Sequence, residues 1–329
     1  MLLVDRKFMN RPLVAVVLAG RIRPTPLSQA LDVHVLRLPV GKRGSLLDSW
    51  LSTFATVGDI GEIRIVVNAP ADVESVGASV TTATPEVQAH PLRIMAEPAA
   101  WRGAGGILRD VTADLPAEAI VVVGEAMRLP PRSLQSLLAA FDSSPEQISG
   151  VVGVCGADEP AGVYAFTRSA IDLIPGIGYF DMKEQFLPAI ARSGGKVITA
   201  RLSEKVWRLR DLESYLETAR QSLASCEGQG SLIRVSDRAS VSSSAVLDGF
   251  CMIEEGAVIE DGAVIHDSVV LWGATVGGGA VVSQSIVGPL AQIEPRTRVI
   301  RECVTRPLSM SNGNRITRMR RAVTGSRTP

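Results

Sequence analysis

Short aliphatic runs alternate with helically spaced apolar positions over the first two thirds of the chain. Runs typical of buried strands occupy residues 13–18, 63–67 and 119–123. Helical patterns occupy residues 45–54, 103–112 and 131–141. Continuous Val/Ile strands between helices predict a Rossmann-like α/β domain with a parallel sheet covered on both faces. Ligands of such sheets bind beyond the C-terminal strand ends, so residues that follow the runs are the first candidates for a site.

A different pattern begins near residue 230, where a large aliphatic residue recurs at every sixth position. The first register comprises Val235, Val241, Leu247, Ile253, Ile259, Ile265 and Leu271. It drops one residue, resumes at Val276 and Val282, slips again near Gly288, and continues at Ile293 and Val299. Two positions before most of these stands a small residue: Ala239, Ala245, Cys251, Ala257, Ala263, Ala274, Ala280 and Ala291.

This hexapeptide pattern predicts a left-handed parallel β-helix with triangular coils of about eighteen residues. The large residue stacks inside each coil, and the small residue fits the corner. Ordinary β-hairpins would instead show a period of two. The chain is therefore expected to comprise an α/β domain at 1–228, a β-helix at 229–305 and a basic tail at 306–329. The tail is either solvated or contacts an anionic partner, because it holds arginines and no acidic residue.

Composition narrows the functional classes. Of 329 residues, 34 are basic and 34 acidic, and zero net charge argues against a whole-protein nucleic-acid binder. The hydrophobic content of 46% excludes a mostly disordered chain. The four cysteines are far apart and form no C-x-x-C pair, which argues against a zinc site or a disulfide framework. The early apolar run at 12–20 is too short to span a bilayer. These features predict a soluble cytoplasmic protein with no membrane partner.

Several segments follow the motif order of one enzyme family. They read LAGRIRPTPLS at 18–28, EPAAWRGAG at 97–105, IVVVGE at 120–125, AGVYAF at 161–166 and FDMKEQFLP at 180–188. With the hexapeptide region, they make residues 12–300 resemble the sugar-1-phosphate nucleotidyltransferases, or sugar-nucleotide pyrophosphorylases. Within that group the chain looks most like relatives of mannose-1-phosphate guanylyltransferase and glucose-1-phosphate adenylyltransferase. The resemblance implies conversion of an NTP and a sugar 1-phosphate to an NDP-sugar and pyrophosphate.

The resemblance also implies site residues. The nucleotide-binding set is Leu18, Ala19, Gly20, Arg21, Glu97, Gly103, Ala104 and Gly105. Arg23 would be catalytic, stabilising charge on the leaving pyrophosphate. The family loop L-A-G-G-x-G-T-R is two residues shorter here and lacks two glycines, which normally let backbone N–H groups wrap the triphosphate. The family's phosphate-contacting lysine is also missing beside Pro39, where Arg37 or Lys42 is the candidate substitute.

The sugar side of the motif is better kept. Gly162 and Glu184 would bind the sugar, and Lys183 would pair with its phosphate as a second catalytic residue. Without the resemblance, Lys183 and Glu184 would be read as an exposed pair at the start of a helix.

The metal ligands are altered. Active relatives carry Gly-Asp after the third strand, and this chain has Gly124-Glu125. The family's second carboxylate aligns with Leu209, and Asp211 lies two residues later. Glu125 and Asp211 are therefore the candidate Mg²⁺ ligands. Because magnesium requires strict octahedral geometry, weak or absent metal binding is expected.

Three functions remain open at this stage. The first is an active nucleotidyltransferase. The second is a catalytically weak or silent homologue that binds sugar nucleotides as a regulatory or scaffold subunit, either as a homo-oligomer or with an active homologue. The third is a hexapeptide-repeat acyltransferase with His266 as general base. The substrates of the first two are a nucleotide and a sugar phosphate.

Overall fold

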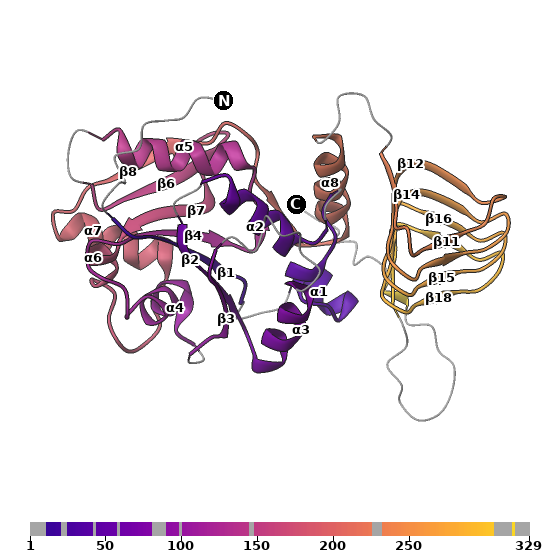
Figure 1. Ribbon diagram of the computed structural model, residues 1–329, viewed down its shortest axis with the longest axis horizontal. Coiled ribbons are helices and arrows are strands. Elements are labelled where there is room, and N and C mark those ends of the chain that lie inside the picture. Colours follow the sequence, from indigo (N-terminus) through magenta and orange to yellow (C-terminus); the bar gives the residue numbers. More distant parts are fainter. Residues whose placement is uncertain are drawn as a thin grey trace, which may run out of the picture. The chain divides into compact units, whose positions relative to one another are not determined.

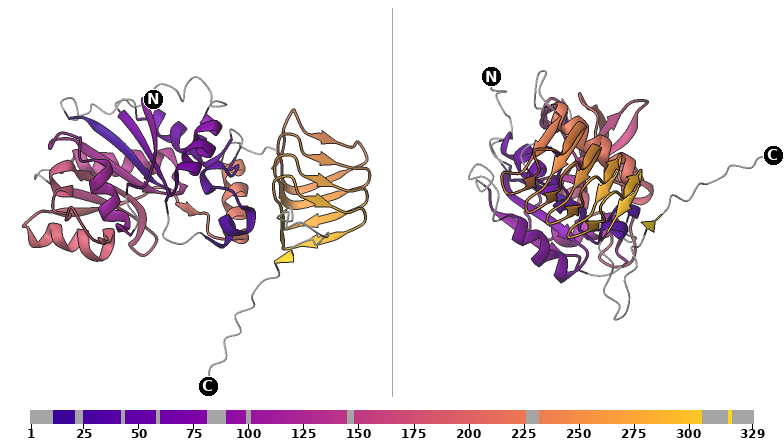
Figure 2. Two further views of the ribbon diagram at one scale, coloured as in Figure 1. Left: turned by 90° about the horizontal axis from the view of Figure 1, so that it is seen from below. Right: turned by 90° about the vertical axis from the view of Figure 1, so that its right-hand side faces the viewer.

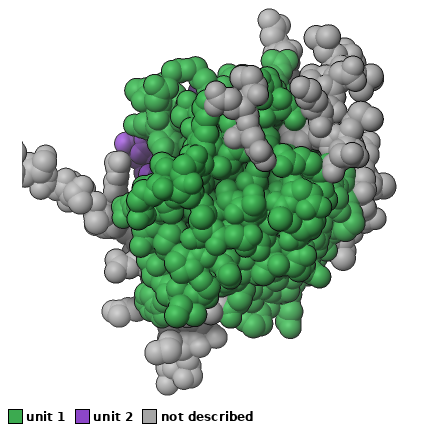
Figure 3. Space-filling view, turned by 90° about the vertical axis from the view of Figure 1, so that its left-hand side faces the viewer, with its two compact units in different colours: residues 1–23, 34–39, 43–208 green, residues 24–33, 40–42, 209–329 purple. Residues whose placement is uncertain are grey.

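The computed structural model describes residues 11–20, 25–41, 44–57, 60–80, 90–98, 101–144, 148–225, 232–305 and 318–319. The chain divides into two compact units, coloured separately in Figure 3. Unit 1 comprises residues 1–23, 34–39 and 43–208, and unit 2 comprises residues 24–33, 40–42 and 209–329. No helix among the described residues combines the length and apolarity that crossing a membrane requires.

Unit 1 is built on a seven-stranded sheet with the order β3-β2-β1-β4-β7-β6-β8 (Figure 1). Its strands are β1 (Leu13–Leu18), β2 (Ile60–Val67), β3 (Leu92–Ala96), β4 (Ile120–Glu125), β6 (Gly150–Cys155), β7 (Glu159–Thr167) and β8 (Val197–Arg201). A separate two-stranded sheet pairs β5 (Met127–Arg128) with β9 (Trp207–Arg208). The helices are η1 (Val35–Arg37), α2 (Leu46–Ala55), α3 (Pro70–Val80), α4 (Gly103–Val111), α5 (Pro131–Asp142), α6 (Arg168–Ile171), the π-helix η3 (Met182–Phe186) and α7 (Leu187–Arg192).

The prediction of an all-parallel sheet is wrong for one strand. Strands β3, β2, β1 and β4 are parallel, but β7 is antiparallel to both β4 and β6. The cause is a tight turn at residues 156–158, where Gly156 and Asp158 both have positive φ. A short turn returns the chain beside the strand it has just left, and this fixes an antiparallel pair. The result is a mixed α/β sheet with a Rossmann-like parallel half.

Helices cover both faces of this sheet, as predicted (Figure 1). On one face, α4, α6, η3 and α7 pack over alternate residues of β1, β4 and β7 in a common core. The opposite face carries α2 and α5. Helix α2 begins at a capping box, in which Ser45 and Asp48 satisfy each other's backbone N–H groups. Helix α5 begins with Pro131 and buries Leu134, Leu137, Leu138 and Phe141 at helical spacing.

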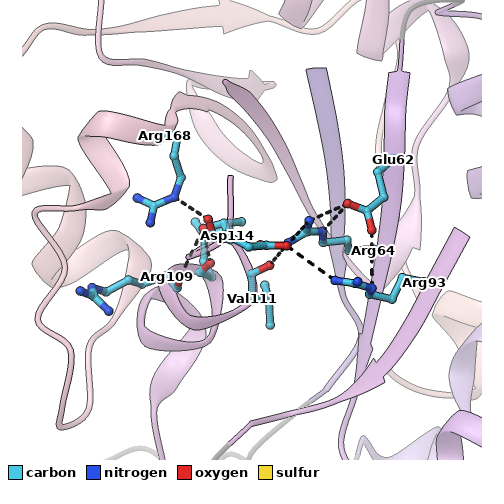
Figure 4. Close-up of polar contacts among 9 residues, drawn as sticks. Glu62, Arg64, Arg93, Arg109, Val111, Asp114 and Arg168 are labelled. Carbon is cyan, nitrogen blue, oxygen red and sulfur yellow. Dashed lines mark hydrogen bonds and ion pairs between the residues drawn. The ribbon is translucent and has the colours of Figure 1, made fainter. Parts of the chain in front are cut away.

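One buried cation is built into the α4 face (Figure 4). Arg64 on β2 is almost completely buried and donates hydrogen bonds to the Val111 carbonyl, to Glu62 and to Asp114. The Arg64 guanidinium holds the pKa of Asp114 below its usual range. A buried charge is tolerated when it is paired and hydrogen-bonded in this way, so this network has a structural role.

Unit 2 contains the predicted β-helix (Figure 2). Its strands are β10 (Ile233–Val235), β11 (Ser240–Val241), β12 (Val246–Ile253), β13 (Val258–Ile259), β14 (Val264–Val270), β15 (Thr275–Val276), β16 (Val281–Ser283), β17 (Ile286–Val287), β18 (Gln292–Ile293), β19 (Arg298–Ile300) and β20 (Cys303–Val304). All of these pair in parallel with the equivalent strand of the next coil. Of the predicted tail at 306–329, the structure describes β21 (Arg318–Met319), which pairs antiparallel with β20.

The interior follows the hexapeptide pattern, but each later coil spans seventeen residues rather than the predicted eighteen, as the pairings of Val258 with Thr275 and of Thr275 with Gln292 show. The stacked core contains Ile253, Ile259, Ile265, Val276, Val282, Ile293 and Val299, with small residues such as Ala257 and Ala274 between them. Leu271, however, is not part of that core. Ile253 pairs with Val270, and Val270 pairs with Val287. The residue is therefore lost on β14 between His266 and Ser268, opposite Asp248 to Cys251 of β12, which is earlier than the sequence pattern indicates.

Two helices outside the repeat region also belong to unit 2. They are α1 (Pro26–Leu31) and α8 (Leu212–Ala224). Helix α1 packs beside β20, and α8 packs beside β14. Leu27 and Leu31 of α1 are buried, as are Tyr215 and Leu223 of α8. These helices cover apolar surface of the β-helix.

Candidate functional site

The predicted site segments of unit 1 meet at one edge of the sheet. Strands β1, β2, β3 and β4 are parallel, so their C-terminal ends lie together, and β7 starts at the same edge because it runs the other way. Leu18 pairs with both Val66 and Glu125, and Gly124 pairs with Val163. Strand β1 lies between β2 and β4, and the order of the strands reverses at this point of the sheet. Such a switch point is where α/β sheets bind ligands.

Glu125 lies between two cationic side chains at this edge. Its Oε1 is 3.8 Å from Lys183 Nζ, and its Oε2 is 3.4 Å from Arg208 Nη2. Glu125 ends β4, Lys183 lies on η3 and Arg208 lies on β9. Three elements far apart in the sequence thus form one charged cluster, here called the Glu125 cluster.

Gly162 makes room for this cluster. Its φ is +83°, in the left-handed region that residues with a Cβ rarely adopt. A Cβ built on Gly162 would lie 2.7 Å from Arg208 Nη2 and 3.0 Å from the Glu125 carboxyl carbon. In this chain, glycine at position 162 therefore leaves the space that the cluster occupies.

Tyr164, two residues further along β7, places a phenol close to the cluster. Its hydroxyl is buried and has no hydrogen-bond partner among the described residues. Burial raises the pKa of Tyr164, and the negative charge of Glu125 raises it further. Tyr164 therefore remains a neutral donor at physiological pH.

A second group of predicted residues lies at the ends of β1, β2 and β3. Gly20 lies directly against the side chains of Glu97 and Asn68, and a Cβ on Gly20 would overlap both. The backbone N–H groups of Ala19 and Gly20 donate to the Val66 carbonyl. Burial raises the pKa of Glu97 above its ordinary value. Gly20 and Glu97 are thus brought together as the motif order implies.

The N-terminus of α4 is arranged differently from the expectation. Gly105 and Gly106 donate their backbone N–H groups to the Phe180 carbonyl, so this carbonyl occupies donors that a phosphate would use. Gly103 has a φ of +70°, and its Cβ would lie 2.7 Å from the Phe180 oxygen. Ala104 is half-buried between these glycines. In this arrangement, Gly103 and Gly105 serve close packing against the 178–180 loop.

Arg102 secures the same loop, a role that the sequence patterns did not indicate. Its guanidinium is buried and pairs with Asp110 at 2.7 Å and 2.9 Å. It also donates to the carbonyls of Gly178 and Pro175. The loop that leads into η3 is therefore fixed just before Lys183.

Lys183 and Glu184 open η3, where Asp181 forms the cap. The Asp181 carboxylate accepts the backbone N–H groups of both residues at 2.7 Å and 2.8 Å. Both side chains are exposed. Lys183 reaches the Glu125 cluster, whereas Glu184 forms no hydrogen bond or ion pair with it among the described residues.

The residues present do not fit the Mg²⁺ that the family resemblance implies. Glu125 is the one carboxylate of its cluster, and two cations already lie against it. Asp211 belongs to unit 2, where its carboxylate caps α8 by accepting the Ser214 N–H. The residue at the family's aligned position, Leu209, is buried and apolar. Within the described ranges, no three His, Cys, Asp or Glu side chains form a group able to hold a metal ion.

The remaining predicted residues fall into three groups. Arg21, Arg23 and Lys42 lie outside the described residues. Arg37 donates to Ser75 on α3. His266 is half-exposed on β14 and pairs with Asp248 at 2.9 Å and with Asp267 at 3.3 Å.

Sequence reasoning missed Arg208 and Tyr164. Arg208 reaches the cluster through the pairing of β9 with β5, which directly follows Glu125. Such a long-range pairing leaves no local signal. Tyr164 was visible as part of the AGVYAF strand, but its place beside Glu125 depends on the antiparallel pairing of β7 with β4.

An α/β sheet with a candidate site at its switch point and a hexapeptide β-helix together define the architecture predicted for a sugar nucleotidyltransferase. Residues 230–307 match the model of the GMPPB C-terminal domain. This match confirms the resemblance to mannose-1-phosphate guanylyltransferase-like proteins through the β-helix. Among curated proteins, none matches the chain significantly.

Proposed function

We propose that this chain is a relative of the sugar-1-phosphate nucleotidyltransferases that binds sugar nucleotides and transfers nucleotide weakly or not at all. The observation that carries this proposal is the placement of Glu125 between Lys183 and Arg208. In the family motif, a carboxylate at this place holds the ion beside the reacting phosphates. Here it neutralises protein cations instead, so no step of the transfer is assigned to a metal.

The proposed binding of sugar nucleotides is supported by the polar and charged residues at the C-terminal edge of the sheet. Glu97 and Asn68 lie over Gly20 at the ends of β1 to β3, and the Glu125 cluster lies at the end of β4. Carboxylate and amide groups suit the hydroxyl and base edges of a nucleotide, and cations suit its phosphates. A regulatory or scaffold role beside an active homologue, or in a homo-oligomer, follows for a cytoplasmic protein that binds this ligand without turnover.

An active nucleotidyltransferase is the second candidate. It is favoured by Gly162 and Lys183, two motif residues that converge on Glu125. An acyltransferase is not proposed. The ring nitrogens of His266 are both engaged by carboxylates, and the pairing of β14 with β16 continues directly at this residue.

A pyrophosphate-release assay combined with calorimetry tests the proposal. The full chain is incubated with Mg²⁺ and each combination of nucleoside triphosphate and sugar 1-phosphate, and binding of the matching NDP-sugars is measured in parallel. We expect at least one NDP-sugar to bind and pyrophosphate release to be weak or undetectable. Losing a positioned metal removes several kcal/mol of transition-state stabilisation, which is about a thousandfold in rate or more.

Two results would contradict it. Robust Mg²⁺-dependent release that is abolished by Asp211→Asn would mean that Asp211 has taken over the metal role and that the chain is an active enzyme. Absence of binding for every NDP-sugar would remove the proposed ligand. Function would then have to lie in the β-helix or in the basic tail.

A further inference from the structure

We infer that Lys183 and Arg208 form a diphosphate-binding pair that works without a metal, and that Glu125 is an internal counter-ion which the ligand displaces. The inference deepens the proposed function and rests on it for the identity of the ligand. It assigns a role to Arg208, which stands at a motif position with no role of its own in the family pattern.

The first argument is the looseness of the Glu125 ion pairs. The buried arginines elsewhere in unit 1 form ion pairs of hydrogen-bond length, such as Arg102 to Asp110 at 2.7 Å and Arg64 to Asp114 at 2.6 Å. Glu125 is 3.4 Å from Arg208 and 3.8 Å from Lys183. Charge-assisted hydrogen bonds are usually about 2.7–2.9 Å long. Glu125 therefore balances the charge of the two cations without forming short hydrogen bonds to them, so their N–H donors can still bind a ligand.

The second argument is that these donors have few other partners. Among the described residues, the Lys183 ammonium has one ion pair, with Glu125, and no hydrogen bond. Arg208 adds one long hydrogen bond, 3.4 Å from Nη2 to the Pro160 carbonyl. By contrast, the buried guanidinium of Arg102 is used by two backbone carbonyls as well as by Asp110. Arg102 therefore has a structural role, whereas most N–H donors of Arg208 have no partner among the described residues and can bind a ligand.

The third argument is access and charge. The side chains of Lys183, Glu125 and Arg208 are 41%, 35% and 24% exposed, so an anion can reach all three. Two cations and one carboxylate leave the cluster with one net positive charge. The nearby Asp181 carboxylate keeps its charge, which the two backbone N–H groups at the start of η3 partly offset. The cluster therefore attracts an anion rather than a second cation.

The donor chemistry of the two cations suits a diphosphate. A guanidinium presents paired N–H donors that bind two oxyanion oxygens at once, and an ammonium acts as a point charge on the neighbouring phosphate. Because each cation lies nearest a different oxygen of Glu125, the two cations can each face one phosphate. The ligand's oxygens then replace those of Glu125, and binding includes the cost of breaking both ion pairs.

The counter-ion role and a metal-ligand role predict opposite changes in diphosphate affinity when the charge of Glu125 is removed. If Glu125 were a metal ligand, removing its charge would weaken binding of a diphosphate with its metal. If Glu125 is a counter-ion, Glu125→Gln removes the competitor and tightens binding. Two partly exposed ion pairs are each weak, so we expect an increase in affinity of about three- to tenfold.

Calorimetry with inorganic pyrophosphate in EDTA, on the full chain, tests the inference. Glu125→Gln should bind pyrophosphate about three- to tenfold more tightly than wild type, while Lys183→Gln and Arg208→Gln should each bind at least tenfold more weakly. Arg201→Gln is the matched control, because Arg201 lies on β8 and forms an exposed ion pair with Asp158. It should leave the affinity unchanged. Thermal melts confirm that each variant is folded, and Glu125→Ala provides a second variant with the same expected sign.

The outcomes separate this inference from the proposed function. Weaker pyrophosphate binding by both Glu125 variants, or wild-type binding that is lost in EDTA and restored by Mg²⁺, would overturn the counter-ion role even if an NDP-sugar binds. Equal affinity in wild type and Arg208→Gln would overturn the cation pair. Conversely, tighter binding by Glu125→Gln supports the inference even if no NDP-sugar binds, and the proposed function alone would then fail.

Discussion

At the residue scale, Gly162 leaves the space that the charged cluster at the sheet edge occupies. The positive φ at Gly162 brings the backbone of β7 close to Glu125 and Arg208. Any side chain there would enter the space of the charged cluster. Gly162 thus belongs to a segment that resembles a family motif, and its lack of a side chain also makes room for the cluster. The cluster also needs Arg208, but no local sequence pattern identifies Arg208 as a site residue.

Gly162→Ala should lower stability and reduce pyrophosphate binding together. A Cβ at positive φ costs about 1–2 kcal/mol, and displacement of Glu125 and Arg208 adds to that cost. Gly194→Ala is the control, because Gly194 has a φ of +80° and no atom within 4 Å of its built Cβ. Chemical denaturation and calorimetry measure both effects. Equal losses of stability in the two variants, with unchanged binding in both, would show that Gly162 is only a backbone requirement.

At the level of elements, the β-helix follows directly from its sequence pattern. A six-residue period places Ile259, Ile265 and Val282 inside the stack because each coil side contributes one inward aliphatic residue. The corners are less visible. Gly256 and Gly273 have positive φ as glycines do, but Leu290 takes the same conformation one coil later. In each later coil, the side that is one residue shorter contains a residue with positive φ: Asp267, Gln284 or Arg301. Because none of these is a glycine, the sequence did not show where the register changes.

Ile265→Ala tests the stacked interior. Ile265 is fully buried between Leu247 and Val282 of the neighbouring coils, so its truncation should lower the free energy of unfolding by about 2–5 kcal/mol. The adjacent Val264 on the same strand is only partly buried, and Val264→Ala serves as the control with an expected cost below about 1.5 kcal/mol. Denaturant unfolding gives both values. Similar costs at the two positions would mean that the inward register is assigned to the wrong residues.

In unit 1, the sequence predicted the positions of the helices and strands along the chain better than the pairing of the strands. Strand β1 and helices α2, α4 and α5 fall where the apolar patterns place them, to within a few residues. The direction of β7 was missed because a three-residue turn decided it. The candidate site shows the same limit. Residues next to strand ends, such as Gly20 and Glu125, could be predicted, while a partner supplied by pairing of distant strands could not.

On the scale of the whole molecule, the units do not follow a single cut in the sequence. The hexapeptide pattern begins near residue 230, and the expected domain boundary lies at 228. Unit 2 nevertheless includes α8, which precedes that boundary, and α1, which lies near the start of the chain. The Leu27 N–H donates to the Arg210 carbonyl, and the Val40 carbonyl accepts the Ser222 hydroxyl. Segments separated by most of the α/β domain thus complete one compact unit.

A fragment that starts at residue 229 should therefore be less stable than unit 2 in the full chain, although it keeps every hexapeptide repeat. It would lack both α8, which packs beside β14, and α1, which packs beside β20, and would expose the apolar surface that they cover. Extension to residue 209 restores α8 and should recover part of the stability, with α1 still missing. Light scattering and thermal unfolding of the two fragments measure the effect: we expect association and early melting for the shorter one, and a higher melting temperature for the longer one. A monodisperse shorter fragment that melts with the longer one would show that the repeats alone specify the fold of unit 2, and that α1 and α8 only rest against it.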